Sequence, residues 1–256
     1  MSGLRESALG PVRVLTLARP PGNALDLAAL AALRAALGRA VGDPSVRALV
    51  LDSEIPRYFS SGLDLAELAA LPEARRREPF ESLLEAYRDL LECPKPVVAA
   101  LSGSALLGGW VLAMACDWRL AAPTAKVSLA EIRAALTPTS ALIGRLSSLA
   151  GDPRAVKEMV LRGKALGATE ALAAGLLDEV VPEAEVRPAA RALAARLAKS
   201  PPRAFAAVKR ALNAAAAAEG VRRRALEEFS AVFAGDEAKE GVAALRDKRR
   251  PRWEGA

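Results

Sequence analysis

One stretch of the sequence decides the fold, and it reads Val97-Val98-Ala99-Ala100-Leu101-Ser102-Gly103-Ser104-Ala105-Leu106-Leu107-Gly108-Gly109-Trp110-Val111-Leu112-Ala113-Met114-Ala115-Cys116. It contains no charged residue and is as long as a membrane span. Small residues between Ser102 and Gly109 interrupt it, however, and divide it into unlike parts. We therefore predict a buried strand over Val97–Leu101, a glycine loop and a helix over Trp110–Ala115, at the centre of a soluble domain.

The segments on both sides of this stretch alternate between strand and helix patterns. A helix capped by Asp26 and a second over Phe80–Leu91 have apolar residues every three or four positions. From about Thr139 the pattern is helical except at Asp178–Val181. Four further strands are expected, over Val12–Leu17, Val46–Leu51, Trp118–Ala121 and Val127–Leu129. The order predicts an α/β fold with a mostly parallel sheet, followed by a helical C-terminal third.

Composition restricts the chemistry. The 256 residues include no histidine, so His-based triads and His-rich metal sites are excluded. The net charge is +6, but aromatic residues make up only 4% of the chain, so the basic residues are not interleaved with aromatic side chains that could stack on bases. RNA binding is therefore the weakest of the possibilities, and we expect no nucleic-acid partner. The positive balance also suits a small polyanion such as the phosphates of coenzyme A.

The compartment is expected to be cytoplasmic. The first ten residues lack the apolar core of a signal peptide, and Cys93 and Cys116 do not make a disulfide framework. We expect both thiols to be reduced and buried, and we expect no membrane association.

Three segments, in this order and spacing, resemble the crotonase (enoyl-CoA hydratase/isomerase) superfamily. The segments are Phe59-Ser60-Ser61-Gly62-Leu63-Asp64-Leu65, Gly103-Ser104-Ala105-Leu106-Leu107-Gly108-Gly109 and Ser128-Leu129-Ala130-Glu131-Ile132 with Pro138 beyond it. The likeness extends from Arg19-Pro20 to the ending Lys248-Arg249-Arg250-Pro251. The motifs are similar to those of 3-enoyl-CoA to 2-enoyl-CoA isomerases in particular.

The resemblance implies a crotonase-like ββα-spiral core over residues 1–195 and a C-terminal helical oligomerisation region over residues 196–256. It also implies a homotrimer or homohexamer, an acyl-CoA thioester as substrate and no cofactor apart from the coenzyme A of that substrate. No metal is expected.

By the same resemblance, the main-chain amides of Leu63 and Gly108 form an oxyanion hole. Two aimed N–H donors lower the cost of the negative charge that develops on a thioester oxygen when a neighbouring carbon loses its proton. A glycine allows a ligand to approach the main chain closely, and a helix that starts there adds a favourable dipole. The alternative is that Gly108-Gly109 only permits tight packing between a strand and a helix.

Glu131 is the expected proton carrier. It follows an apolar run, so burial should raise its pKa towards the working range of an acid/base catalyst. From spacing alone, a solvated glutamate paired with Arg133 is the better interpretation, and the family likeness reverses that preference.

The second glutamate of the family's hydratases is absent, because its position is occupied by Val111. A double-bond shift can use one base, whereas hydration benefits from two carboxylates. The sequence therefore favours an isomerase. A hydratase that holds water by other groups, and a catalytically silent acyl-CoA-binding protein, remain open alternatives.

Several other residues are candidates to contact coenzyme A: Arg19, Ser61, Asp64, Leu65 and Lys248, with Lys95 as a further cation. Asp64 follows a glycine turn, so capping a helix is its more natural role.

Overall fold

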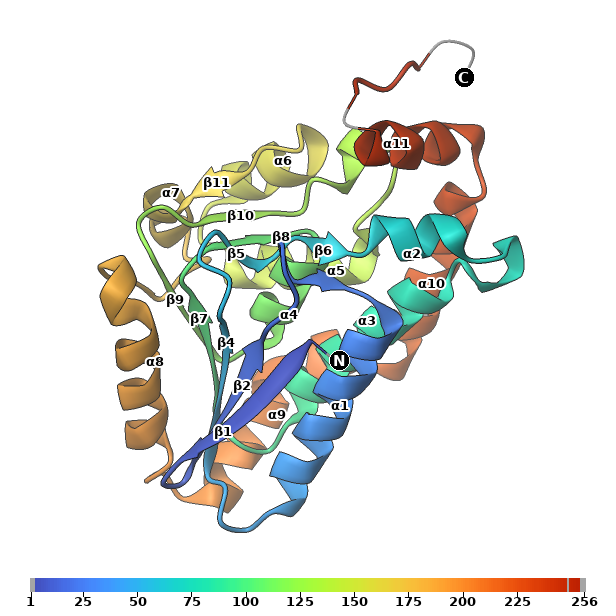
Figure 1. Cartoon of the computed structure of the whole chain (residues 1–256). Helices are drawn as coiled ribbons and strands as arrows, with labels where there is room; N and C mark the ends of the chain where they lie inside the picture. The colour runs from blue at the N-terminus through green and yellow to red at the C-terminus, as the bar shows by residue number, and fades with distance from the viewer. Residues whose placement is uncertain (1–2, 248, 254–256) are drawn as a thin grey trace.

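The segment Val97–Leu101 forms a strand, β7, inside a six-stranded sheet (Figure 1). The computed structural model describes residues 3–247 and 249–253 of the chain. Every pair in the sheet is parallel except the antiparallel first pair, as predicted. Across the sheet the strands are β1 (Leu4–Leu9), β2 (Val12–Leu17), β4 (Ala48–Ser53), β7, β9 (Trp118–Ala121) and β12 (Glu179–Val180).

Both faces of the sheet are buried at its central strands β4 and β7, which explains why these strands are mainly apolar runs. In β7, Val97, Ala99 and Leu101 join the larger core, and Val98 and Ala100 join the smaller one. The covering helices lie on opposite faces of the sheet (Figure 1). Helix α8 (Glu183–Leu197) covers the smaller core, and α1 (Leu27–Gly42), α3 (Glu78–Glu92) and α4 (Gly108–Ala115) lie over the larger one.

A second, smaller sheet lies across the end of the first one. Its four strands run β11 (Leu166–Gly167), β10 (Lys126–Ser128), β8 (Ser104–Leu106) and β5 (Tyr58–Ser60). The pairs β5–β8 and β8–β10 are parallel, and β10–β11 is antiparallel. A third pair joins β3 (Ala24–Leu25) to β6 (Gly62–Leu63) in parallel.

The sequence did not predict all of these elements. β5 and β8 were interpreted as loops and β3, β6 and β11 were missed, because strands of two or three residues are too short to show a period. β1 has six residues but was also missed, because it is an exposed edge strand with few apolar residues. Helix α4 also begins at Gly108, two residues before the predicted start at Trp110.

The remaining helices surround the carboxyl ends of the strands and the larger core. They are α2 (Leu65–Ala70), the 3₁₀ turns η1 (Glu73–Arg75) and η2 (Glu131–Ala134), α5 (Thr139–Leu149), α6 (Pro153–Leu161), α7 (Ala168–Ala173), α9 (Pro202–Ala217), α10 (Glu219–Phe233) and α11 (Asp236–Arg246). The helical C-terminal third is thus confirmed. Among the described helices, none is long and apolar enough to cross a membrane.

Helix α9 attaches to the core through polar side chains. Lys209, with 4% of its side chain exposed, pairs with Asp117 at 2.8 Å, and Asp117 also accepts a hydrogen bond from the N–H of Val97. An adjoining face of α9 exposes 59% of Val208 and 78% of Leu212. An outward apolar stripe suits a subunit contact, so the homotrimer or homohexamer stays a prediction, as does the boundary at residue 195.

Helix α11 packs against η2 at one glycine. A Cβ on Gly241 would lie 2.0 Å from the carbonyl oxygen of Ala134, which is a backbone atom and cannot move aside as a side chain can. The C-terminal helix therefore lies directly on the turn that begins at Glu131.

We predict that Gly241→Ala separates α11 from η2, because the added methyl group overlaps the Ala134 backbone. Hydrogen exchange followed by mass spectrometry should report faster exchange in α11 and in residues 131–136. Gly220→Ala is the matched control, because a Cβ there meets no atom within 4 Å. Equal exchange in the two variants would contradict this packing.

Candidate active site

Three strands of the small sheet end beside one another and place the three predicted catalytic residues. β5 ends at Ser60, shortly before Leu63; β8 ends at Leu106, shortly before Gly108; and β10 ends at Ser128, shortly before Glu131. Because the three strands are parallel neighbours, their carboxyl ends meet at one edge, where ligands of α/β proteins commonly bind. The fold thus brings together three residues that are far apart in the sequence.

Leu63 and Gly108 lie against each other. A Cβ added to Gly108 would be 3.4 Å from the peptide nitrogen of Leu63, and one added to Gly62 would be 3.2 Å from the nitrogen of Gly108. Gly108 is the first residue of α4, so its N–H has no acceptor within that helix. The predicted oxyanion-hole amides therefore lie side by side, one of them at the positive end of a helix dipole.

The turn into α4 is held in an unusual conformation. Leu107 has φ 50° and ψ −124°, a region that favours glycine, and its N–H donates to the carbonyl of Ser128 at 2.8 Å. This bond ties the Gly108 turn to the strand that leads to Glu131. Behind the turn, a Cβ on Gly109 would be 2.5 Å from the carbonyl oxygen of Ser60, so that position requires glycine for close packing.

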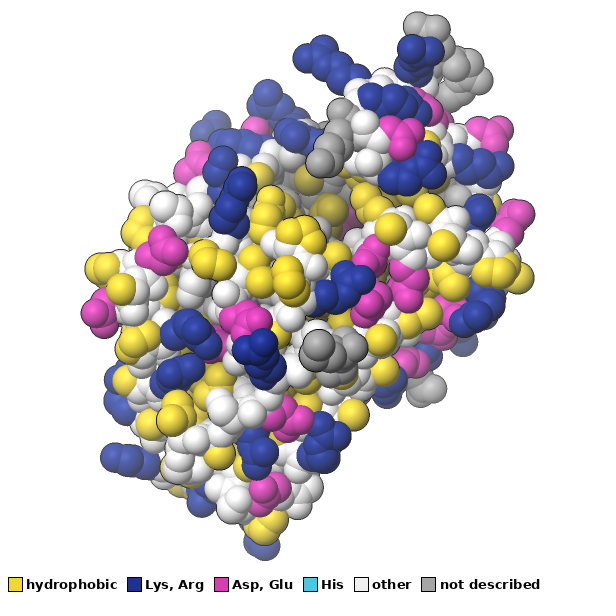
Figure 2. Space-filling view, in the orientation of Figure 1, with side chains coloured by type: hydrophobic (Ala, Val, Ile, Leu, Met, Phe, Trp, Pro, Cys, Tyr) yellow, Lys and Arg dark blue, Asp and Glu magenta, His cyan; other side chains and the backbone are white. Residues whose placement is uncertain are grey.

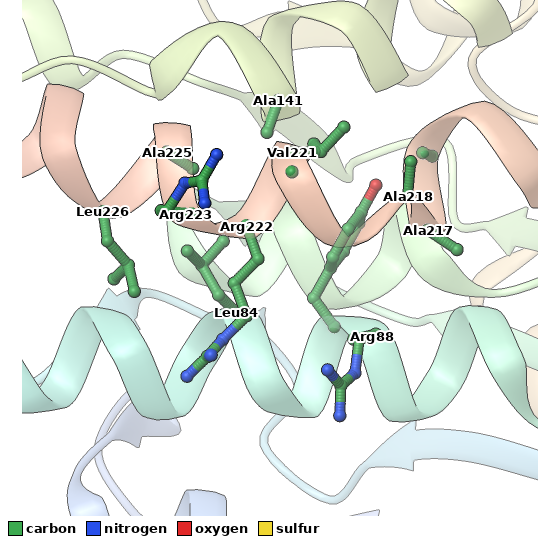
Figure 3. A pocket seen from close by; sticks show the side chains of 13 residues that line it. Leu84, Arg88, Ala141, Ala217, Ala218, Val221, Arg222, Arg223, Ala225 and Leu226 are labelled. Carbon is green, nitrogen blue, oxygen red and sulfur yellow. The ribbon is translucent and has the colours of Figure 1, made fainter.

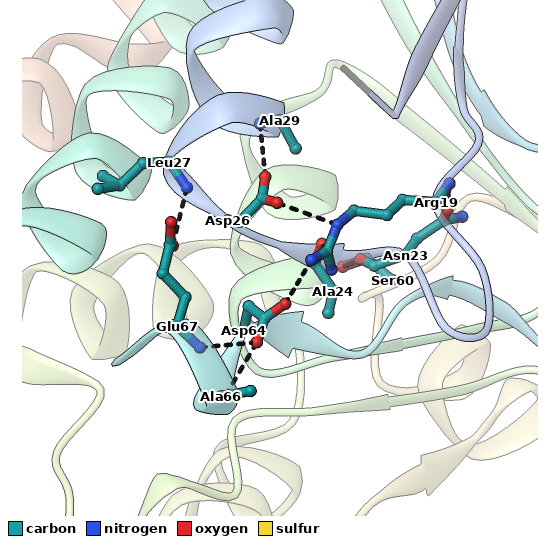
Figure 4. Close-up of polar contacts among 10 residues, drawn as sticks. All are labelled: Arg19, Asn23, Ala24, Asp26, Leu27, Ala29, Ser60, Asp64, Ala66 and Glu67. Atoms are coloured by element: carbon teal, nitrogen blue, oxygen red, sulfur yellow. Dashed lines mark hydrogen bonds and ion pairs between the residues drawn. The ribbon is translucent and has the colours of Figure 1, made fainter. Parts of the chain in front are cut away.

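A network of charged side chains fixes the segment around Leu63 (Figure 4). The Arg19 guanidinium contacts Asp26 at 3.0 Å and Asp64 at 2.6 Å. Asp26 caps α1 through the N–H of Ala29, and Asp64 caps α2 through the N–H groups of Ala66 and Glu67. Arg19 thereby links the first turns of two helices, and the capping role expected for Asp64 is confirmed.

The charge state of Asp64 follows from this network. Burial by itself would raise its pKa, but the hydrogen bond from the N–H of Glu67 and the Arg19 guanidinium outweigh that effect and hold its pKa below the ordinary value. Asp64 is therefore an ionised structural carboxylate that lies outside the lining of the cavity described next.

Leu63, Gly108 and Glu131 line one cavity of about 280 Å³. Its walls are mainly apolar, with Val111 on the α4 side and with Phe229 and Leu245 from the C-terminal helices. Figure 2 shows the molecular surface hollowed below α11, with hydrophobic side chains on its visible walls. The cavity is thus an apolar chamber with few polar groups, as small-molecule sites commonly are.

Within this cavity the carboxyl group of Glu131 is withdrawn from water. The residue as a whole keeps some exposed surface, but its Oε2 atom is inaccessible and has no hydrogen-bond partner among the described residues. Desolvation raises the pKa of Glu131 to about 8. The solvated, Arg133-paired alternative is wrong, since the charged pairs of the described chain include none with Glu131.

The residues expected to contact coenzyme A separate into distinct groups. Ser61 and Leu65 line the cavity, whereas Arg19 is held between two carboxylates. Lys95 donates to the carbonyls of Ala40 and Asp43 and so caps the end of α1. Lys248 lies outside the described residues. Contact of Arg19, Ser61, Asp64, Leu65 and Lys248 with coenzyme A stays a prediction.

Sequence reasoning missed several residues of the lining. Thr137 lies just before the Pro138 of the third motif, and Leu142, Phe229 and Leu245 reach the lining from segments after the motifs. No short motif marks the last two, and only their apolar spacing on helices indicated that they face inward.

A second hollow, of about 590 Å³, lies between α3 and α10 (Figure 3). Its lining includes Leu84, Arg88, Ala141 and Leu226 but no carboxylate and none of the motif residues. The Glu131 cavity is therefore the candidate active site. The described residues also contain no cluster of acidic and cysteine side chains that could hold a metal ion, and both cysteines are free and buried.

Known proteins resemble this chain over nearly its whole length. The sequence model of the enoyl-CoA hydratase/isomerase family matches residues 8–256. The chain is 36% identical over 251 residues to a probable enoyl-CoA hydratase of Bacillus subtilis, covering 95% of each protein. It is 34% identical over 252 residues to the carnitinyl-CoA dehydratase of Salmonella typhi, covering 96% of each.

Its structure superposes on the human mitochondrial delta3-delta2-enoyl-CoA isomerase with a TM-score of 0.90, at 26% identity, covering 96% of this chain and 97% of that one. This likeness confirms the crotonase-like fold expected from the motifs. The chain therefore belongs to the enoyl-CoA hydratase/isomerase family.

Proposed function

We propose that the chain is an enoyl-CoA isomerase that moves a double bond from the 3-position to the 2-position of an acyl thioester. One observation carries the proposal: in the described part of the chain, Glu131 is the only carboxylate on the lining of the cavity that contains Leu63 and Gly108. Val111, where a second acid would serve hydration, is apolar and 1% exposed. One acid/base group suits a proton shuttle.

In the proposed reaction, the thioester oxygen accepts hydrogen bonds from the Leu63 and Gly108 amides. The Glu131 carboxylate removes a proton from C2, and the electron pair of the C–H bond delocalises onto that oxygen as a dienolate. Glu131 then returns the proton to C4, which leaves the double bond between C2 and C3. Atoms and charge balance without a cofactor, and the amides stabilise the charge that develops in the transition state.

The pKa of Glu131 supports this role. Burial raises the pKa of Glu131 to about 8. A carboxylate with this pKa is a strong enough base to take an acidified C–H proton, and its conjugate acid is strong enough to give the proton back. The apolar walls of the cavity also keep water away from the dienolate.

Hydration or dehydration is the second candidate, because the relatives at 36% and 34% identity are called a hydratase and a dehydratase. Water would then be held by Glu131 together with a hydroxyl group such as that of Thr137, which is on the same lining. A catalytically silent acyl-CoA-binding protein would keep the cavity and lack turnover.

We expect purified protein to convert a 3-enoyl-CoA into the 2-enoyl-CoA, and Glu131→Gln to lower kcat by 10²-fold or more, because the amide cannot carry the proton. Ultraviolet absorbance of the conjugated thioester measures the rate. In the wild type, kcat/KM should rise with pH and level off above about 8, where Glu131 is ionised.

Glu170→Gln is the control for this experiment, since Glu170 is an exposed carboxylate paired with Lys164. Rapid hydration of the 2-enoyl-CoA without any double-bond shift would rule out the isomerase. Unchanged turnover in Glu131→Gln would rule out both enzymatic candidates.

The same pKa shift predicts the pH dependence of stability. Glu131 keeps its proton up to about pH 8 in the folded protein but loses it near pH 4.5 in the unfolded chain. The contribution of this proton to the free energy of unfolding is therefore fully present below pH 4.5 and is lost as the pH rises to 8. Glutamine cannot ionise, so only the wild type loses this stability as the pH rises. The free energy of unfolding of Glu131→Gln minus that of the wild type should therefore be about 3 kcal/mol larger at pH 8.5 than at pH 5.5. Urea titrations at the two pH values measure this difference, which should be absent in Glu170→Gln.

A further inference from the structure

A second chamber adjoins the Glu131 cavity. It has a volume of about 490 Å³ and lies between α2 and η1 on one side and α10 and α11 on the other. The two spaces share Leu68 and Phe229 as lining residues. The wall between the two spaces therefore includes the side chains of Leu68 and Phe229.

A row of stacked rings leads from one space to the other. Phe80 lines the Glu131 cavity and stacks on Phe229 with ring centroids 4.1 Å apart. Phe229 stacks on Phe233 at 5.1 Å, and Phe233 lines the second chamber. The rings form a continuous apolar surface along which an acyl chain can lie.

The charged side chains on the lining of the second chamber are mostly positive. Four cationic side chains and one carboxylate, Glu73, line it: Arg76, Arg77, Lys239 and Arg246 are the cations. Lys239 and Arg246 pair with Asp236 and Asp247, at 2.8 Å and 2.7 Å. The ion pairs of the described residues include none that involve Arg76 or Arg77. The Nε of Arg76 donates to the Leu71 carbonyl, which leaves its terminal nitrogens available.

We propose that this second chamber binds the distal end of the acyl chain, and that this end is a carboxylate recognised by Arg76 and Arg77. The proposal rests on the proposed acyl-CoA function and names its substrate class as ω-carboxylated acyl thioesters. The reacting carbons lie by Glu131, the chain follows Phe80, Phe229 and Phe233, and the terminal carboxylate meets the two arginines. Arginine suits this task because its planar fork matches a carboxylate.

The test compares three 3-enoyl-CoA substrates: a four-carbon one, a ten-carbon one that ends in methyl and a ten-carbon one that ends in carboxylate. The double variant Arg76→Gln with Arg77→Gln should lower kcat/KM for the carboxylate-ended substrate roughly tenfold and leave the other two almost unchanged. Arg75→Gln is the matched control, because Arg75 is exposed, pairs with Glu78 and does not line the chamber. It should leave all three values unchanged.

Ala69→Trp is an independent variant. Ala69 is an exposed residue of the chamber lining, so the indole should fill the chamber without disturbing the core. It should lower kcat/KM for both ten-carbon substrates and leave the four-carbon one unchanged.

Two outcomes would overturn the inference. An equal loss with all three substrates in the double variant would mean that the arginines act on the coenzyme A part, and no loss with the carboxylate-ended substrate would mean that they contact no carboxylate. Calorimetric Kd values for the saturated counterparts of the ten-carbon pair should show the same tenfold effect. They test the chamber even if no substrate is turned over, so failure of the proposed reaction stays distinguishable from failure of this inference.

Discussion

The register of three short parallel strands is the constraint on which the site depends. Ser60 pairs with Ala105 in β5 and β8, and Leu106 pairs with Ser128 in β8 and β10. A shift of one residue in either pair would turn every side chain of the moved strand to the opposite face. The Leu107 N–H donates a hydrogen bond to the Ser128 carbonyl. This bond stabilises the pairing of β8 with β10 and extends it into the turn that precedes Gly108.

Two consequences follow from that register. The first is that the main-chain N–H groups of Leu63 and Gly108, 45 residues apart in the sequence, lie close together, with Arg19 bracing one loop and close packing at Gly109 bracing the other. The second is that Glu131 begins its turn inside an apolar cavity, under α11. The cost of ionising a desolvated carboxyl group raises its pKa to about 8, so the chemistry available at Glu131 is a product of the packing around it.

The sequence predicted the central strand and the main helices, because each carries a strong local signal. Leu63, Gly108 and Glu131 were singled out by the resemblance to the family and not by a local signal of their own. Val97–Leu101 is a long apolar run, and Asp26 is a capping residue before periodic leucines. The sequence could not predict the strands β5 and β8, because three residues are too few to show a period. These two strands nevertheless position the site. Nor could the sequence show that Arg19 braces two helix caps, or that Phe229 and Leu245 complete the cavity, because those contacts depend on how distant segments pack.

A crystal structure with a non-reactive acyl-CoA bound tests the central claim most directly. We expect the thioester oxygen to lie about 3 Å from the peptide nitrogens of both Leu63 and Gly108, with the Glu131 carboxyl group beside C2 and within roughly 3.5 Å of it. A bound thioester whose oxygen contacts neither nitrogen, or whose C2 faces away from Glu131, would contradict it.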